Sequence, residues 1–115
     1  MRYVELHSRS AFSFLRGASQ PEAIMARAAE LEIGAVAVCD RDGVYGSARA
    51  HAKAREAGVR AIVGAELTME DGSVLPVLVA TRAGYRNLCR LISRAKLRAE
   101  HRLPACADRG LPARR

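Results

Sequence analysis

The chain has 115 residues and a net charge of +7 at neutral pH, and half of its residues are apolar although tryptophan is absent. This length allows one domain with a single aliphatic core. No run approaches the roughly 20 apolar residues of a membrane-spanning helix, and the start of the chain lacks the apolar segment of a signal peptide. We therefore expect a soluble, cytoplasmic protein that has no contact with a membrane.

The positive charge is concentrated in the last quarter of the chain. Residues 1–85 hold ten basic and ten acidic side chains, whereas residues 86–115 hold nine basic side chains against Glu100 and Asp108. Such a segment favours contact with nucleic acid through phosphate, although a solvated basic helix explains the charge equally well. The candidate DNA contacts are Arg86, Arg90, Arg94, Lys96 and Arg98.

The first half of the sequence alternates between predicted strands and helices. Residues 3–6 (YVEL) predict a strand, and Ser19–Glu22 (SQPE) predicts a helix start with a capping box and a proline in the first turn. The apolar run AVAVC at 35–39 is typical of a strand covered on both faces. An alanine-rich helix over 47–57 and a strand over 59–67 follow. Because helical crossovers connect the strands, this βαβαβ order requires parallel pairing.

A hairpin and a last helix complete the pattern. The Asp-Gly sequence within 69–73 predicts a turn into a fourth strand over 74–80. Thr81 is placed to cap a helix that has apolar side chains on one side and arginines on the other. We therefore expect an α/β domain with βαβαββα order and mainly parallel strands over 1–100, and a basic, disordered tail over 101–115.

Three polar residues stand where the first three predicted strands end, namely His7, Asp40 and Glu66. Parallel strands bring their carboxyl ends to one edge of a sheet or barrel, where α/β proteins place their active sites. Imidazole and carboxylate side chains suit zinc, manganese or iron, and such metals activate water against phosphate esters. A strand that simply reaches solvent also ends in a polar residue, so the spacing suggests a metal site without establishing it.

The chain resembles the polymerase and histidinol phosphatase (PHP) domain at the N-terminus of bacterial C-family DNA polymerases. The similarity begins with YVELHSRSAFSFLRGAS, where the family strand typically ends L-H-x-H-S. It continues through AVAVCDRDGVYGSARAHAKAREAGVRAIVGAEL and through LPVLVATRAGYRNLCRLISRA, which matches a G-Y-x-N-L helix of the family. The wording SFLRGAS and DRDGVYG is most similar to the error-prone branch, which is associated with damage-induced, lesion-tolerant synthesis.

This resemblance, which covers residues 3–98, implies a fold and a set of partners. A PHP domain is a distorted barrel of seven βα units, so the chain would form about its first half and leave sheet edges open to self-association. Nothing in the sequence is similar to a polymerase palm with its catalytic carboxylates. We therefore expect a fragment without polymerase activity, whose partners are the remainder of the polymerase or other replication and repair proteins.

The resemblance also assigns candidate metal ligands residue by residue. His7, Asp40 and Glu66 match ligand positions of the family. Three positions where the family has further possible ligands carry a cation instead, namely Arg9, Arg16 and Arg41. Arginine stays protonated and has no lone pair for a metal ion. We interpret the site as a salt-bridged remnant, with Arg9 and Arg41 near the two carboxylates, that holds a divalent ion (manganese, zinc or magnesium) weakly or not at all.

Three classes of function remain open at this point. The favoured one is the PHP module of an error-prone DNA polymerase, with a structural role and a degenerate metal site. The second is a metal-dependent phosphoesterase, which His7, Asp40 and Glu66 favour and the arginines oppose. The third is a small basic nucleic-acid-binding protein that acts through residues 86–115.

Overall fold

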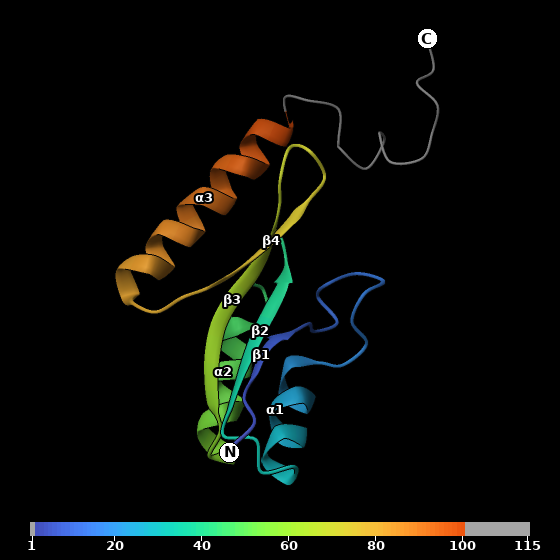
Figure 1. Ribbon diagram of the computed structural model, residues 1–115, viewed down its shortest axis with the longest axis vertical. Coiled ribbons are helices and arrows are strands. Elements are labelled where there is room, and N and C mark those ends of the chain that lie inside the picture. The colour runs from blue at the N-terminus through green and yellow to red at the C-terminus, as the bar shows by residue number, and fades with distance from the viewer. Residues whose placement is uncertain (1, 101–115) are drawn as a thin grey trace.

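The computed structural model describes the backbone of residues 2–100 and the side chains of residues 2–98 (Figure 1). Its elements are β1 (Glu5–Ser8), α1 (Pro21–Glu30), β2 (Ala35–Arg41), α2 (Ser47–Ala57), β3 (Arg60–Thr68), β4 (Val74–Leu78) and α3 (Arg82–Glu100). This is the predicted βαβαββα order, with the first strand at 5–8 instead of 3–6. The basic tail predicted over 101–115 lies outside the described residues.

The strands form one sheet in the order β1-β2-β3-β4 (Figure 1). β1 pairs with β2 and β2 with β3 in parallel, and this pairing places Arg41 opposite Glu66. β4 runs antiparallel to β3 after a turn in which the Met69 nitrogen donates to the Ser73 oxygen at 2.8 Å. Gly72 takes φ 84° in this turn, a backbone conformation that suits glycine. The mainly parallel sheet and the Asp-Gly turn are therefore both confirmed.

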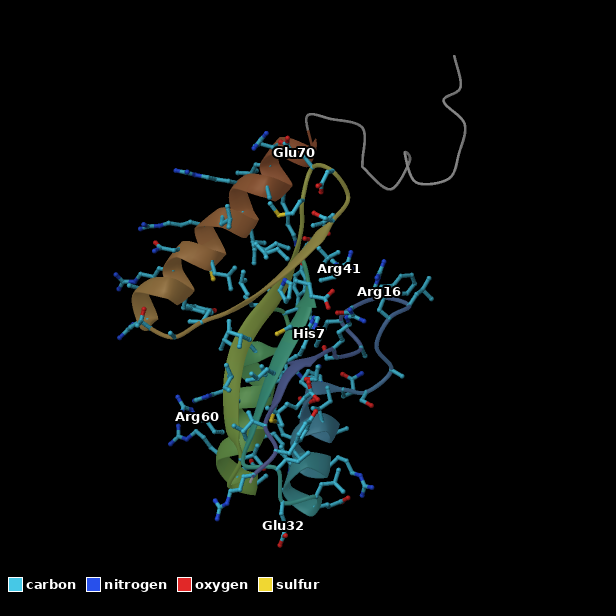
Figure 2. The ribbon with its side chains drawn as sticks, viewed as in Figure 1. His7, Arg16, Glu32, Arg41, Arg60 and Glu70 are labelled. Atoms are coloured by element: carbon cyan, nitrogen blue, oxygen red, sulfur yellow. The ribbon has the colours of Figure 1, made fainter. Side chains whose placement is uncertain are left out.

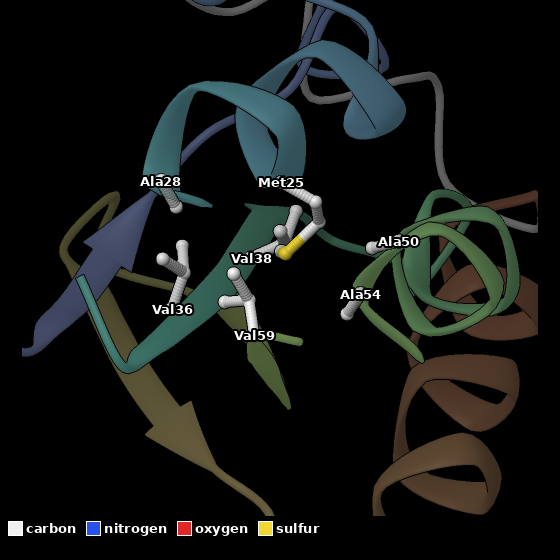
Figure 3. Packing of buried hydrophobic residues seen from close by; sticks show 7 residues of the cluster. All are labelled: Met25, Ala28, Val36, Val38, Ala50, Ala54 and Val59. Atoms are coloured by element: carbon white, nitrogen blue, oxygen red, sulfur yellow. The ribbon is translucent and has the colours of Figure 1, made fainter. Parts of the chain in front are cut away.

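The first two helices pack on the same face of the sheet. The side chains between them and the strands form the core, which consists of Met25, Ala28, Val36, Val38, Ala50, Ala54 and Val59 (Figure 3). Met25 is completely buried and fills the space that the small alanines of α2 leave. Val36 and Val38 both face the helices because side chains alternate along a strand. The core thus fixes the orientation of β2, and with it the face that each later residue of that strand presents.

The helix starts agree only in part with the sequence predictions. The predicted capping box before α1 is wrong, since Gln20 is the N-cap and makes no side-chain cap bond. Glu22 pairs with Arg49 of α2 instead, so an ion pair between the two helices replaces the local cap. The predicted cap of α3 is confirmed, because the Gly84 nitrogen donates to the Thr81 hydroxyl at 3.0 Å.

α3 packs on the outer part of β3 and β4 through only a few residues. Leu88 and Ile92 are 7% and 8% exposed and contact Ala65, with Val77 and Val79 beside them. The rest of α3 extends along the molecule with most of its surface in solvent (Figure 1). Within residues 2–100, none of the helices combines the length and the apolar character that crossing a bilayer requires.

Gly64 of β3 is paired with Cys39 of β2 on one side and with Leu78 of β4 on the other, so its substitution tests the sheet. A Cβ at this position would lie 2.6 Å from the Cys39 sulfur and 2.8 Å from the Val77 oxygen. Gly64→Ala should therefore lower the free energy of unfolding by about 1–3 kcal/mol in urea denaturation. Gly34→Ala is the matched control, because a Cβ there meets nothing within 4 Å. Equal stability of the two variants would contradict this description of the sheet.

Candidate functional site

The predicted site residues do gather at the carboxyl ends of the parallel strands, but they lie on two faces of the sheet. Arg41 stands opposite Glu66, and Asp40 stands opposite Ala65. Neighbouring residues of a strand point to opposite faces. The Glu66 and Arg41 side chains therefore share one face, while Asp40 points to the face that α1 and α2 cover. The three predicted ligands thus do not form one group.

Glu66 is completely buried and accepts hydrogen bonds from three cationic or potentially cationic side chains. Its Oε1 lies 2.5 Å from Nε2 of His7 and 2.6 Å from Nε of Arg9. Its Oε2 accepts from Nε of Arg41 at 3.1 Å. Figure 2 shows His7 and Arg41 near each other at this end of the sheet. The predicted ion pairs of Arg9 and Arg41 thus form with Glu66, and β1, the following loop, β2 and β3 meet at one carboxylate.

The surroundings of Glu66 keep it ionised. Burial acts to raise the pKa of this carboxyl above its ordinary value of 4.5, because a charged group loses hydration. Hydrogen bonds from Arg9, His7 and Arg41, together with the charge of Arg9, outweigh burial and lower the pKa. Glu66 is therefore an anion at neutral pH. Because a carboxylate can only accept, Nε2 of His7 is the donor in the hydrogen bond to Oε1.

Asp40 belongs to a separate network that anchors the loop after β1. Its side chain is 1% exposed. Oδ1 accepts from the Ser10 nitrogen at 2.8 Å and from the Ser13 hydroxyl at 2.7 Å, and Oδ2 accepts from the Ser10 hydroxyl at 2.7 Å. The Ser13 hydroxyl also accepts from the Arg41 nitrogen at 3.1 Å. Both oxygens of Asp40 are thus occupied by a loop that the sequence did not single out for this role.

Asp42 is a further residue that sequence reasoning missed. It adopts φ 52°, a left-handed conformation that aspartate tolerates better than most residues. Its oxygens accept from the Thr68 nitrogen and the Thr68 hydroxyl, each at 2.7 Å. Its own nitrogen donates to the main-chain oxygen of Glu66 at 2.8 Å. Asp42 therefore ties the loop after β2 to the end of β3; its place directly before a glycine was the available signal.

The remaining predicted residues lie away from Glu66. Arg16 is exposed on the loop after β1 (Figure 2) and forms no ion pair within residues 2–98. Of the candidate DNA contacts on α3, Arg98 pairs with Glu70 at 2.8 Å. Lys96 Nζ lies 4.4 Å from the centre of the Tyr45 ring. The other candidates, Arg86, Arg90 and Arg94, are exposed.

The residues present do not fit a cluster of divalent ions. Both oxygens of Glu66 and both oxygens of Asp40 already accept hydrogen bonds. Within residues 2–98, no three His, Cys, Asp or Glu side chains converge as a metal site would require. Burial, with the charges of Glu66 and Asp40 adding to it, raises the pKa of the nearby Cys39 thiol to about 11. That thiol therefore stays protonated at neutral pH and is a poor metal ligand.

Several curated proteins that are similar to this chain are named error-prone DNA polymerase. An error-prone DNA polymerase from Anaeromyxobacter sp. is 48% identical over 99 residues, which cover 82% of this chain and 9% of that protein. Those from Pseudomonas fluorescens and Rhodopirellula baltica are 47% and 43% identical, covering 85% and 87% of this chain. The chain spans only 9–10% of the length of these relatives.

Solved structures share the fold. A protein from Bifidobacterium adolescentis assigned as a metal-dependent phosphoesterase superposes with a TM-score of 0.58 at 20% identity, over 96% of this chain and 40% of that one. An amidohydrolase from Chromobacterium violaceum, solved with sulfate and no metal, gives 0.58 at 24% identity, with the same coverage. The four-stranded sheet thus corresponds to part of a larger fold in both of these proteins. A family model for the PHP domain matches residues 5–111, and the chain belongs to that family.

Proposed function

We propose that this chain is the N-terminal PHP module of an error-prone, lesion-tolerant bacterial DNA polymerase, and that it braces the polymerase without hydrolysing phosphate esters. Relatives of that name, 43–48% identical, support the assignment. Because the chain spans 9–10% of their length, nucleotidyl transfer and the work in DNA replication and repair in the cytoplasm would belong to the larger protein.

The arginine pair on Glu66 is the observation that carries the structural role. Two guanidinium nitrogens lie 2.6 Å and 3.1 Å from a completely buried carboxylate. Arginine cannot coordinate a metal ion. A guanidinium about 4 Å from a divalent ion repels it by roughly 8 kcal/mol at an effective dielectric of 20, twice the value for two unit charges. The protein itself therefore supplies the positive charge that a metal ion would otherwise bring to Glu66.

The same contacts explain how the site stabilises the fold without an ion. A metal centre at the end of parallel strands joins them through its ligands. Here Glu66 of β3 is joined to His7 of β1, to Arg9 and to Arg41 of β2. Because a buried charge is tolerated only when it is paired, these segments have to stay together while Glu66 is ionised. The network therefore holds three strands in register.

Removing the charge of Glu66 should destabilise the protein far more than removing an exposed charge. Glu66→Gln leaves Arg9 and Arg41 without their carboxylate, and breaking a buried pair costs about 3 kcal/mol of the free energy of unfolding. Glu70→Gln is the matched control, because Glu70 and its partner Arg98 are exposed and such pairs contribute about 0–1 kcal/mol. Urea denaturation measures both, and an equally small cost for the two variants would argue against the network.

The stability that Glu66 contributes should disappear in acid. The folded state lowers the pKa of its carboxyl below 4.5, so the unfolded chain binds the proton more readily. The difference in stability between the wild type and Glu66→Gln should be constant above about pH 5.5 and shrink as the pH falls below about 4.5. Urea denaturation between pH 3 and 7 measures this difference. A difference that grows in acid would contradict the lowered pKa.

The proposal that this site holds no metal ion is testable by placing histidine, which the family has there, at positions 9 and 41. Wild-type protein dialysed against manganese should retain far less than one ion per chain, as measured by elemental mass spectrometry. Arg9→His combined with Arg41→His should increase retention, because both positions then offer a lone pair. Addition of His7→Ala should abolish the gain.

The phosphoesterase alternative gives the opposite results in the same experiments. Near-stoichiometric manganese in the wild type that His7→Ala removes would overturn the structural role. Turnover of a generic phosphodiester, with manganese present and His7 required, would establish a hydrolase in its place. We expect the wild type to show no turnover above that of manganese in buffer.

A further inference from the structure

α3 carries an arginine at every fourth position along almost its whole length. These residues are Arg82, Arg86, Arg90, Arg94 and Arg98. With 3.6 residues per turn and a rise of 1.5 Å per residue, each arginine lies about 6 Å further along the axis and about 40° further around it. The residues therefore form one slowly turning row on the helix surface. Residues 82–98 contain no acidic side chain.

The row lies on the solvent side of α3. All of its members are exposed, whereas Leu88 and Ile92 are buried against the sheet. Side chains that end in nitrogen project from α3 away from the sheet in Figure 2. Approach to the row from solvent is therefore open in the part of the chain that the structure describes.

Most of the row has no counter-charge nearby. Arg98 pairs with Glu70, but the arginines at 82, 86, 90 and 94 form no ion pair with any side chain of residues 2–98. Like charges four residues apart destabilise a helix. A sequence that breaks a local rule repeatedly, without a compensating contact, is expected to do so at a functional surface. These four residues, without Arg98, are called the arginine row from here on.

We propose that the arginine row binds the phosphate backbone of duplex DNA without reading its base sequence. The row is about 18 Å long, and one strand of B-DNA presents about five phosphates over that axial distance. Guanidinium groups suit phosphate because they offer several donors in a fixed plane. The inference rests on the proposed function only in that a polymerase module has duplex DNA close by.

The composition of the helix favours duplex over single-stranded DNA. Proteins that bind single strands interleave cations with aromatic side chains on which bases stack. Within residues 82–98 the sequence has one aromatic residue, Tyr85, and it is 38% exposed. The row thus offers charge for a backbone without a platform for unpaired bases.

Salt dependence measured by fluorescence anisotropy, with a labelled 20-base-pair duplex and the 115-residue chain, tests the proposal. Binding is measured between 50 and 200 mM salt. The variant with Arg86→Gln, Arg90→Gln and Arg94→Gln should bind more weakly throughout. Its plot of log K against log salt should be less steep by about 2.7, since each lost phosphate contact reduces the steepness by about 0.9. Circular dichroism confirms that the helix persists, which glutamine favours.

The matched control removes the same charge from exposed sites outside α3. Arg2→Gln, Arg55→Gln and Arg60→Gln together should leave the slope of the wild type unchanged; these three residues are exposed. An equal loss of slope in both triple variants, or no loss in the α3 variant, would overturn the proposal. The proposal would also be overturned if the wild type bound polyglutamate as tightly as the duplex, or bound a single strand of the same length more tightly. Metal content plays no part in these results, so the proposed function and this inference can fail separately.

Discussion

A buried carboxylate has to be paired, and the pairing of Glu66 joins β1, β2 and β3 at the carboxyl end of the sheet. Its three donors come from β1, from the loop that follows it and from β2. Strong hydrogen bonds from arginine keep Glu66 ionised despite complete burial, and in return Glu66 fixes side chains that would otherwise be solvated. The chemistry available at this site follows from that single interaction, because the groups nearest the carboxylate repel cations.

Strand geometry adds a second constraint, which separates the two buried carboxylates, Asp40 and Glu66. Arg41 and Glu66 are paired across β2 and β3, so Asp40, one residue earlier, points to the opposite face. Its charge is met by hydroxyl and amide groups of Ser10 and Ser13. One edge of the sheet thus contains two networks that meet at Arg41, one that joins strands and one that shapes a loop. Neither presents a free pair of oxygens to an incoming ion.

The fold was largely predictable because its signals are local. The Asp-Gly turn before Ser73, the Thr81 cap and the apolar run of β2 each depend on a few neighbouring residues, and each is confirmed. The prediction of a capping box was wrong because Glu22 forms an ion pair with Arg49 of another helix, a contact that no local pattern encodes. Sequence identity to error-prone DNA polymerases and the match to the PHP domain model then established the family.

The site was less predictable, because its contacts join residues far apart in the chain. The sequence indicated that Arg9 and Arg41 would lie near Asp40 and Glu66, but it did not show that both would form ion pairs with Glu66. The roles of Ser10 and Ser13 at Asp40 depend on the path of a loop. The clamp between Asp42 and Thr68 depends on a left-handed backbone conformation. Such features follow from tertiary packing, which period and spacing do not specify.

Diffraction from crystals grown with excess manganese, recorded at a wavelength where manganese scatters anomalously, would show whether a metal ion can reach Glu66. We expect guanidinium density from Arg9 and Arg41 on the Glu66 carboxylate and no anomalous peak within coordination distance of it. A strong peak between His7 and Glu66, with both arginines turned away, would contradict this expectation.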